Sequence, residues 1–204
     1  MKPKFLIYLA DLTHTGPVIS SDVFPYGVGM VGAYLLANYG DDVEVELFKF
    51  PGDLAKALEA QKPGMVGFCN YSWNSFLSYD FAERVKAKYP DTIILFGGPD
   101  YGLSVEEIDV FWREHSLIDF YIVGEGEVSA GCLYTKLKER SFDVRALKSS
   151  GEVLGSCHYV HDGKVVCNDT TPRVKTLTEL PSPYLLGLMD KFWETSLAPL
   201  IATT

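Results

Sequence analysis

Short glycine-rich and polar segments directly follow three strongly apolar runs in this sequence. Residues 97–99 are Gly-Gly-Pro, residues 124–127 are Gly-Glu-Gly-Glu, and residues 70–74 combine two asparagines and a serine with Tyr71 and Trp73. Glycines let a bulky ligand approach the backbone closely, and large aromatic rings can cover a flat one. If the apolar runs are parallel strands, these segments meet at one sheet edge, where α/β proteins bind ligands. The spacing therefore predicts a binding site there.

A long segment without helical or strand periodicity, residues 11–27, follows the first apolar run. It carries Thr13 and His14, ends near the aromatic residues Phe24 and Tyr26, and contains two prolines. Loops of this length in compact domains are usually functional or disordered. The prolines and aromatic rings favour an ordered ligand loop.

The four cysteines, Cys69, Cys132, Cys157 and Cys167, are widely scattered and form no C-x-x-C pair. Neither a zinc site nor a disulfide framework is indicated. We expect reduced thiols in a cytoplasmic protein, no resident metal site, and no catalytic residue within this chain.

Composition limits the classes of partner. The chain has 204 residues, of which 47% are hydrophobic and 22% charged, so it can bury one main core and an appendage. A net charge of −9 provides no basic surface for nucleic acid or for an anionic membrane. No apolar run is long enough to cross a bilayer.

Apolar runs alternate with helical patterns along the first part of the chain. Because parallel strands need crossover connections, this alternation predicts an α/β, doubly wound, Rossmann-like domain with a five-stranded parallel sheet. The second run alternates polar and apolar residues, as an edge strand does, so the expected strand order is 2-1-3-4-5. The expected strands are residues 5–10, 43–47, 65–69, 93–96 and 120–123.

Several residues mark the expected helices. Residues 28–39 are apolar on nearly all sides, and Gly29 and Gly32 would let this helix lie close to the sheet. Asp53 is expected to cap a second helix. Ser104, with Glu107 three residues later, forms a capping box for another.

The pattern changes after residue 140. An Asp-Gly turn at residues 162–163 lies between two short apolar segments and predicts a small β-hairpin annex within residues 141–180. Residues 181–204 resemble a proline-containing linker followed by the start of a missing domain. Their apolar stretch, residues 184–200, is expected to have little core left to cover. The domain prediction is thus 1–140, 141–180 and 181–204.

Other ligand sites of doubly wound sheets fit less well. A phospho-acceptor receiver needs an aspartate after the third strand and a lysine after the fifth, where Cys69 or Asn70 and Gly124 stand. A flavodoxin-type flavin site needs a compact phosphate loop, whereas this loop is long. Residues 27–32 spell the dinucleotide pattern G-x-G-x-x-G, but begin seventeen positions beyond Ala10 instead of at the strand end.

The order of these motifs resembles the amino-terminal cobalamin-binding domain of cobalamin-dependent radical S-adenosylmethionine enzymes. The motifs are Phe-Gly-Gly-Pro at 96–99, Gly-Glu-Gly-Glu at 124–127, Leu-Pro-Ser-Pro at 180–183 and the Phe-Pro-Tyr-Gly entry at 24–27. The resemblance implies a corrinoid over the strand ends, with its nucleotide tail in the cleft between sheet and helices. The family's Cys-x-x-x-Cys-x-x-Cys motif is absent from this chain. S-adenosylmethionine and a 4Fe-4S cluster are therefore expected only in a missing carboxyl-terminal radical SAM domain, which is also the expected protein partner.

The resemblance assigns cofactor contacts to the strand-end segments, with Tyr71 and Trp73 covering the ring and Glu125 as a candidate for hydrogen bonds to a ribose or an amide. Methionine-synthase-like domains ligate cobalt through the histidine of Asp-x-His-x-x-Gly. Here Thr13 takes that place and His14 is one position away, so a cobalt-ligand role for His14 is a minor hypothesis. The expected cofactor-binding residues are Thr13, Tyr26, Asn70, Tyr71, Ser72, Trp73, Gly97, Gly98, Pro99, Gly124, Glu125 and Gly126.

The function expected is a cobalamin-binding fragment of a radical SAM methyltransferase or related radical enzyme, which does not catalyse alone. A non-catalytic Rossmann-like ligand-sensing or interaction module is the alternative, with the apolar segment 184–200 as its interface.

Overall fold

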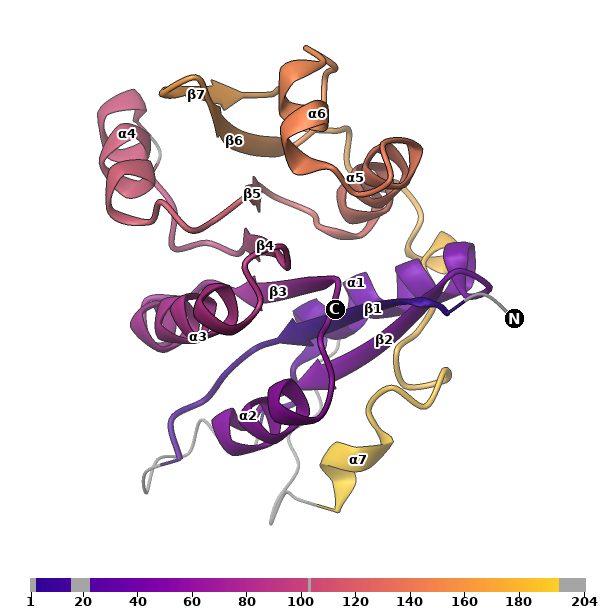
Figure 1. Ribbon diagram of the computed structural model, residues 1–204. Coiled ribbons are helices and arrows are strands. Elements are labelled where there is room, and N and C mark those ends of the chain that lie inside the picture. The colour runs from indigo at the N-terminus through magenta and orange to yellow at the C-terminus, as the bar shows by residue number, and fades with distance from the viewer. Residues whose placement is uncertain (1–2, 16–22, 103, 195–204) are drawn as a thin grey trace.

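A computed structural model describes residues 3–15, 23–102 and 104–194 of the chain (Figure 1). Its centre is one sheet whose seven strands lie in the order β2-β1-β3-β4-β5-β6-β7. The first five strands are parallel, and the last two are antiparallel to their neighbours. The strands are β1 (Phe5–Ala10), β2 (Val43–Phe48), β3 (Met65–Cys69), β4 (Ile93–Gly97), β5 (Phe120–Ile122), β6 (Cys157–His161) and β7 (Lys164–Cys167).

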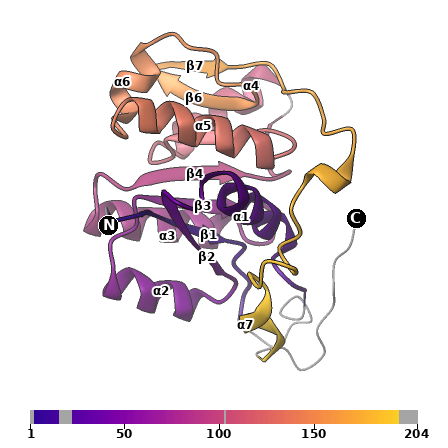
Figure 2. The same ribbon diagram turned by 90° about the vertical axis from the view of Figure 1, so that its right-hand side faces the viewer.

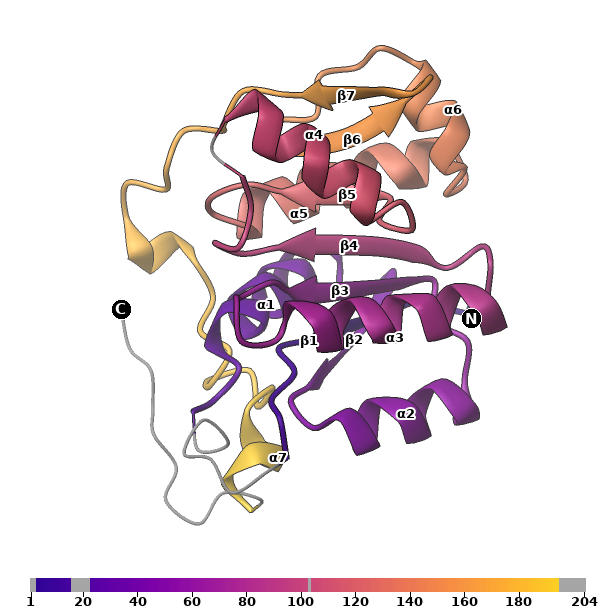
Figure 3. The same ribbon diagram turned by 90° about the vertical axis from the view of Figure 1, so that its left-hand side faces the viewer.

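Helices cover both faces of the sheet. Figure 2 shows α1, α5 and α6 in front of one face, and Figure 3 shows α2, α3 and α4 in front of the other. The alternating residues of the central strands accordingly divide between two apolar cores, one on each face. The helices are α1 (Tyr26–Tyr39), α2 (Pro51–Ala60), α3 (Ser75–Lys88), α4 (Val105–Glu114), α5 (Glu127–Glu139), α6 (Val144–Ser149), α7 (Asp190–Trp193) and the short 3₁₀ helix η2 (Leu177–Glu179).

The predicted parallel order 2-1-3-4-5 is confirmed, and the predicted hairpin forms, but the sheet has seven strands and not the predicted five. The hairpin forms and continues the sheet, because β6 pairs with β5 through Tyr121 opposite His158 and Ile122 opposite Cys157. β5 has a free edge that would otherwise leave backbone groups unpaired. The Asp-Gly turn is as expected, with positive φ at both positions, 48° and 72°.

Helix α1 begins at Tyr26, two positions earlier than expected. Gly32 does face the sheet, since a Cβ there would lie 3.2 Å from a methyl of Val45. Gly29 instead faces the carboxyl-terminal segment at Pro183 and Met189.

Two helix-cap predictions have different outcomes. The capping box of Ser104 and Glu107 at the start of α4 is confirmed in both directions. The N-cap prediction for Asp53 is wrong, because α2 begins three residues earlier than a helix capped by Asp53 would, at Pro51, with Phe50 at the N-cap position. A proline is favoured in the first helical turn, and Asp53 instead supplies a negative charge there.

The carboxyl-terminal segment also differs from expectation. Met189 and Phe192 are buried in the core beside α1, and the Lys191 ammonium lies 3.2 Å from the Glu46 carboxylate on β2. Leu185 and Leu186 remain exposed. The expected uncovered apolar stretch is therefore partly used by the fold itself, and residues 195–204 lie outside the described part of the chain.

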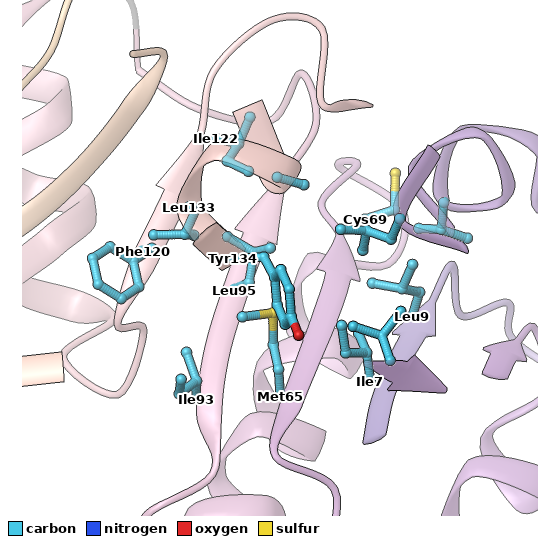
Figure 4. Packing of buried hydrophobic residues seen from close by; sticks show 14 of the residues in the cluster. Ile7, Leu9, Met65, Cys69, Ile93, Leu95, Phe120, Ile122, Leu133 and Tyr134 are labelled. Carbon is cyan, nitrogen blue, oxygen red and sulfur yellow. The ribbon is translucent and has the colours of Figure 1, made fainter. Parts of the chain in front are cut away.

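Helix α5 packs against one face of the sheet through buried apolar side chains. Figure 4 shows side chains of β1, β3, β4 and β5 meeting Leu133 and Tyr134 of α5. Among the described residues, no helix combines the length and the apolar character needed to cross a bilayer.

Candidate functional site

A cleft of about 390 Å³ opens between the carboxyl ends of the parallel strands and helices α1 and α5. Its volume lies in the usual range for small-molecule sites, about 300–1,000 Å³. Apolar side chains from both layers form its walls. They are Leu9, Leu95 and Ile122 from the strands, Val28 and Val31 from α1, and Ala130 from α5.

The floor of the cleft is Gly67, in the middle of β3. A Cβ at this position would lie 2.7 Å from Cδ2 of Leu9 and 3.9 Å from Cδ2 of Leu95, so the missing side chain is what keeps the space between these leucines open. A glycine inside a strand often marks the close approach of a ligand. The cleft therefore reaches down to the backbone of a central strand.

The mouth of the cleft is formed by the glycine-rich segments that follow β4 and β5. Gly98 has φ +127°, and a Cβ there would lie 2.5 Å from the carbonyl oxygen of Asn70, so only glycine fits. Gly124 has φ +81°, and a Cβ there would meet no described atom within 4 Å. Gly98 thus lets the segments that follow β3 and β4 pack together, and Gly124 leaves open space at the mouth of the cleft.

The structure brings seven of the twelve expected residues to the cleft and places five beside it. Thr13 and Asn70 are buried, Trp73 and Ser72 are exposed beside the mouth, and the Tyr26 ring stacks on Tyr184 with centroids 6.0 Å apart. The residues that line the cleft are Tyr71, Gly97, Gly98, Pro99, Gly124, Glu125 and Gly126.

Tyr71 and Trp73 form a flat aromatic surface at the edge of the cleft. Their rings are stacked with centroids 4.3 Å apart and an interplanar angle of 9°. Tyr71 lines the cleft, whereas 58% of Trp73 is exposed. An exposed tryptophan on a stacked tyrosine offers an apolar face to a ligand lying outside the cleft.

His14 is held by the segment that carries this aromatic pair. Its Nε2 lies 2.9 Å from the carbonyl oxygen of Trp73. Donation to this carbonyl occupies Nε2 and leaves Nδ1 as the ring nitrogen open to a metal, so a cobalt-ligand role for His14 stays a minor hypothesis.

Asp11, the residue after β1, is a half-buried carboxyl group. It accepts a hydrogen bond from Nδ2 of Asn74 at 3.1 Å. Burial raises the pKa of Asp11 to about 6, although the Asn74 hydrogen bond and the nearby Lys49 charge act in the opposite direction.

The Cys69 thiol lies in the wall of the cleft, next to the Tyr71 hydroxyl. Burial raises the pKa of Cys69 to about 12, with a further contribution from the Asp11 charge. The neighbouring Cys69 and burial raise the pKa of Tyr71 to about 12 as well. Both groups are therefore protonated at neutral pH.

The Glu125 carboxylate contacts the segment that follows β7. Its carboxylate accepts a hydrogen bond from the Val174 backbone N–H at 3.0 Å and lies 3.6 Å from the Arg173 guanidinium. The segment after the hairpin thus contacts the rim of the cleft directly.

Sequence reasoning missed the walls and the floor of the cleft. Gly67 carried a usable signal, because a glycine in an otherwise apolar central strand favours close approach of another group. The wall residues on α1 and α5 gave no such signal, since apolar side chains on a covering helix are equally typical of core packing. The missed lining residues are Leu9, Val28, Val31, Gly67, Phe68, Cys69, Leu95, Phe96, Ile122, Glu127 and Ala130, together with Gly27.

A doubly wound sheet with an apolar cleft under glycine-rich strand ends defines a ligand-binding α/β domain. The family of the B12 binding domain matches residues 15–131, more than half of the chain. The chain belongs to this family and is a B12-binding domain.

Comparison with individual proteins agrees with the family. Over 130 residues the chain is 29% identical to the cobalamin-dependent radical SAM methyltransferase TokK of Streptomyces tokunonensis. The aligned region covers 63% of this chain and 18% of TokK. Over 151 residues it is 26% identical to the 2-(S-pantetheinyl)-carbapenam-3-carboxylate methyltransferase of Streptantibioticus cattleyicolor, covering 74% and 21%. The chain thus spans about a fifth of the length of these curated relatives.

The fold is also that of part of a solved enzyme. The cobalamin-dependent S-adenosylmethionine radical enzyme OxsB, with aqua-cobalamin and S-adenosylmethionine bound, matches with a TM-score of 0.63 and 19% identity. The match covers 93% of this chain and 25% of OxsB. The form of OxsB without cofactors gives a TM-score of 0.58 at 18% identity, covering 91% and 25%.

Proposed function

We propose that this chain is the cobalamin-binding part of a longer cobalamin-dependent radical SAM enzyme, a methyltransferase or a related radical enzyme. The proposal is supported by the named relatives and by the share of their length that the chain spans. The chain lacks Cys-x-x-x-Cys-x-x-Cys, so S-adenosylmethionine and an iron–sulfur cluster belong, in this proposal, to another domain of the same cytoplasmic polypeptide. Residues 1–140 form the cofactor domain, 141–180 its hairpin extension, and 181–204 lead toward that domain.

The observation that carries the proposal is the cleft with Gly67 at its floor. A cavity of about 390 Å³ is too small for a complete cobalamin but suits its nucleotide tail. The tail lies in the cleft, against the apolar walls, and the corrin ring lies outside over the strand ends. The open position at Gly124 leaves room where the tail leaves the cleft.

The rim residues hold the cofactor in this arrangement. Gly97, Gly98 and Gly126 let it approach the backbone, and Tyr71 and Trp73 cover the face of the ring turned toward the protein. Ser72 and Tyr26 lie near the ring edge, whereas the buried Thr13 and Asn70 contribute through the shape of their loops. Bound cobalamin supplies a cobalt centre that can relay a methyl group.

Titration with hydroxocobalamin tests the proposal. We expect the 204-residue chain to take up one cobalamin per chain, with a change in the visible absorbance and retention of colour through gel filtration. Absence of uptake by both this chain and the full-length protein would contradict the proposal. A coding sequence that continues past residue 204 into a cysteine triplet favours the radical enzyme, and a stop codon favours the non-catalytic module.

His14→Ala tests the cobalt-ligand hypothesis. Because the His14 imidazole is hydrogen-bonded to the Trp73 carbonyl, we expect the visible spectrum of bound cobalamin to be the same in the variant and the wild type. A shift of the visible bands at saturating cofactor would instead show that His14 binds cobalt.

A further inference from the structure

Two buried asparagines flank the Tyr71–Trp73 pair in the loop after β3. Asn74 is 0% exposed and Asn70 is 2% exposed. Buried amides are costly unless they are hydrogen-bonded, so their partners indicate what they stabilise.

Asn74 joins this loop to the loop after β1. Its Oδ1 accepts the backbone N–H of Tyr71 at 2.9 Å, which fixes the orientation of the amide. Its Nδ2 then faces two acceptors of the other loop, Oδ1 of Asp11 and the carbonyl oxygen of Leu12, both at 3.1 Å. The His14–Trp73 hydrogen bond is a second tie between the same two loops.

Asn70 joins the other end of the loop to the rim after β4. Its Nδ2 donates to the Asp100 carbonyl at 2.5 Å, and its backbone carbonyl accepts the Asp100 N–H at 3.1 Å. The hydroxyl of Tyr121 donates to the Gly98 carbonyl at 2.8 Å and so holds the same rim from β5.

We propose that Asn74 and Asn70 are positioning residues that fix the Tyr71–Trp73 surface before cobalamin binds. The inference rests on the proposed function, because it assigns this surface to the corrin ring. Hydrogen bonds hold both ends of the loop that carries the aromatic pair, so cofactor binding costs little additional conformational entropy of this loop. Preorganisation of this kind increases affinity.

The Asn74→Asp variant tests this role through pH. Near pH 8 the new carboxylate faces the Asp11 carboxylate and donates no hydrogen bond, so the two loops separate. Near pH 5.5 the pair shares a proton, since two adjacent carboxyl groups cannot both ionise readily. The other titratable groups around Asp11 are Lys49, Cys69 and Tyr71, and His14 is hydrogen-bonded to the Trp73 carbonyl between the same two loops.

We expect Asn74→Asp to bind hydroxocobalamin about tenfold more weakly than the wild type at the higher pH, and within about threefold of it at the lower pH. Asn168→Asp is the matched control, because the Asn168 amide donates to the Cys157 carbonyl on β6, away from the cleft. We expect it to stay within about twofold of the wild type at both pH values. A tenfold loss that does not recover at the lower pH contradicts the proposal.

Near-ultraviolet circular dichroism of the cofactor-free chain tests the positioning separately from cofactor binding. The signal of the stacked pair is identified as the part lost in Trp73→Phe. We expect Asn74→Asp to lose this part at the higher pH and regain it at the lower pH, and His14→Ala, which changes only an exposed side chain, to reduce it. Full retention in Asn74→Asp at the higher pH overturns the positioning role, whereas failure of the wild type to bind cobalamin overturns the proposed function alone.

Discussion

Gly67→Val is expected to weaken cobalamin binding by about a hundredfold, equivalent to about 2.7 kcal/mol, while the sheet remains folded. The new side chain projects between Leu9 and Leu95 into the cleft, where the nucleotide tail is proposed to lie. Overpacking of a filled core costs about 1–3 kcal/mol. Here the added Cβ lies 2.7 Å from Cδ2 of Leu9, the far end of a flexible side chain, so we expect Leu9 to turn away at the lower end of that cost. Valine also favours the strand conformation.

The measurement is a titration with hydroxocobalamin, accompanied by thermal unfolding of the cofactor-free chain. Gly52→Val is the matched control, because an added Cβ there meets no described atom within 4 Å and α2 lies on the opposite face of the sheet. We expect the control to bind like the wild type. Equal affinities of Gly67→Val and the wild type would show that the tail does not occupy this cleft.

The parallel part of the fold could be predicted because its signals are local and repeated. Strands buried on both faces, such as β3 and β4, appear as uninterrupted apolar runs, and the alternating run of β2 identifies an edge. The position of the hairpin could not be predicted in this way. Its attachment depends on a free edge of β5, and strand pairing across a long separation leaves no periodic pattern in either segment.

The residues of the site also divide into those that the sequence predicts and those that it does not. The rim could be predicted because glycines at strand ends are needed for backbone conformation and close approach, as at Gly98. The asparagine ties depend on distances between loops, which the sequence does not contain. Asn70 is a predicted cofactor contact, and in the structure its amide also donates to the Asp100 carbonyl, which the sequence does not reveal.

Phe192→Ala is expected to lower the free energy of unfolding by about 3 kcal/mol. The Phe192 side chain is only 3% exposed, and its ring lies 6.2 Å from that of Phe24, just before α1. Removing it leaves a cavity in the core that joins the carboxyl-terminal segment to the start of α1. Because α1 forms one wall of the cleft, we also expect weaker cobalamin binding.

Urea unfolding of the cofactor-free chain measures this loss, and Leu185→Ala is the control from the same segment. Leu185 is 90% exposed, so its truncation is expected to change stability by less than about 0.5 kcal/mol. A large difference between the two variants means that residues up to Phe192 are an integral part of the cofactor domain, although the sequence resembles a linker there. Equal, small effects would mean that the segment is a linker that contributes little to folding, and the wall at α1 would then be stabilised by the sheet alone.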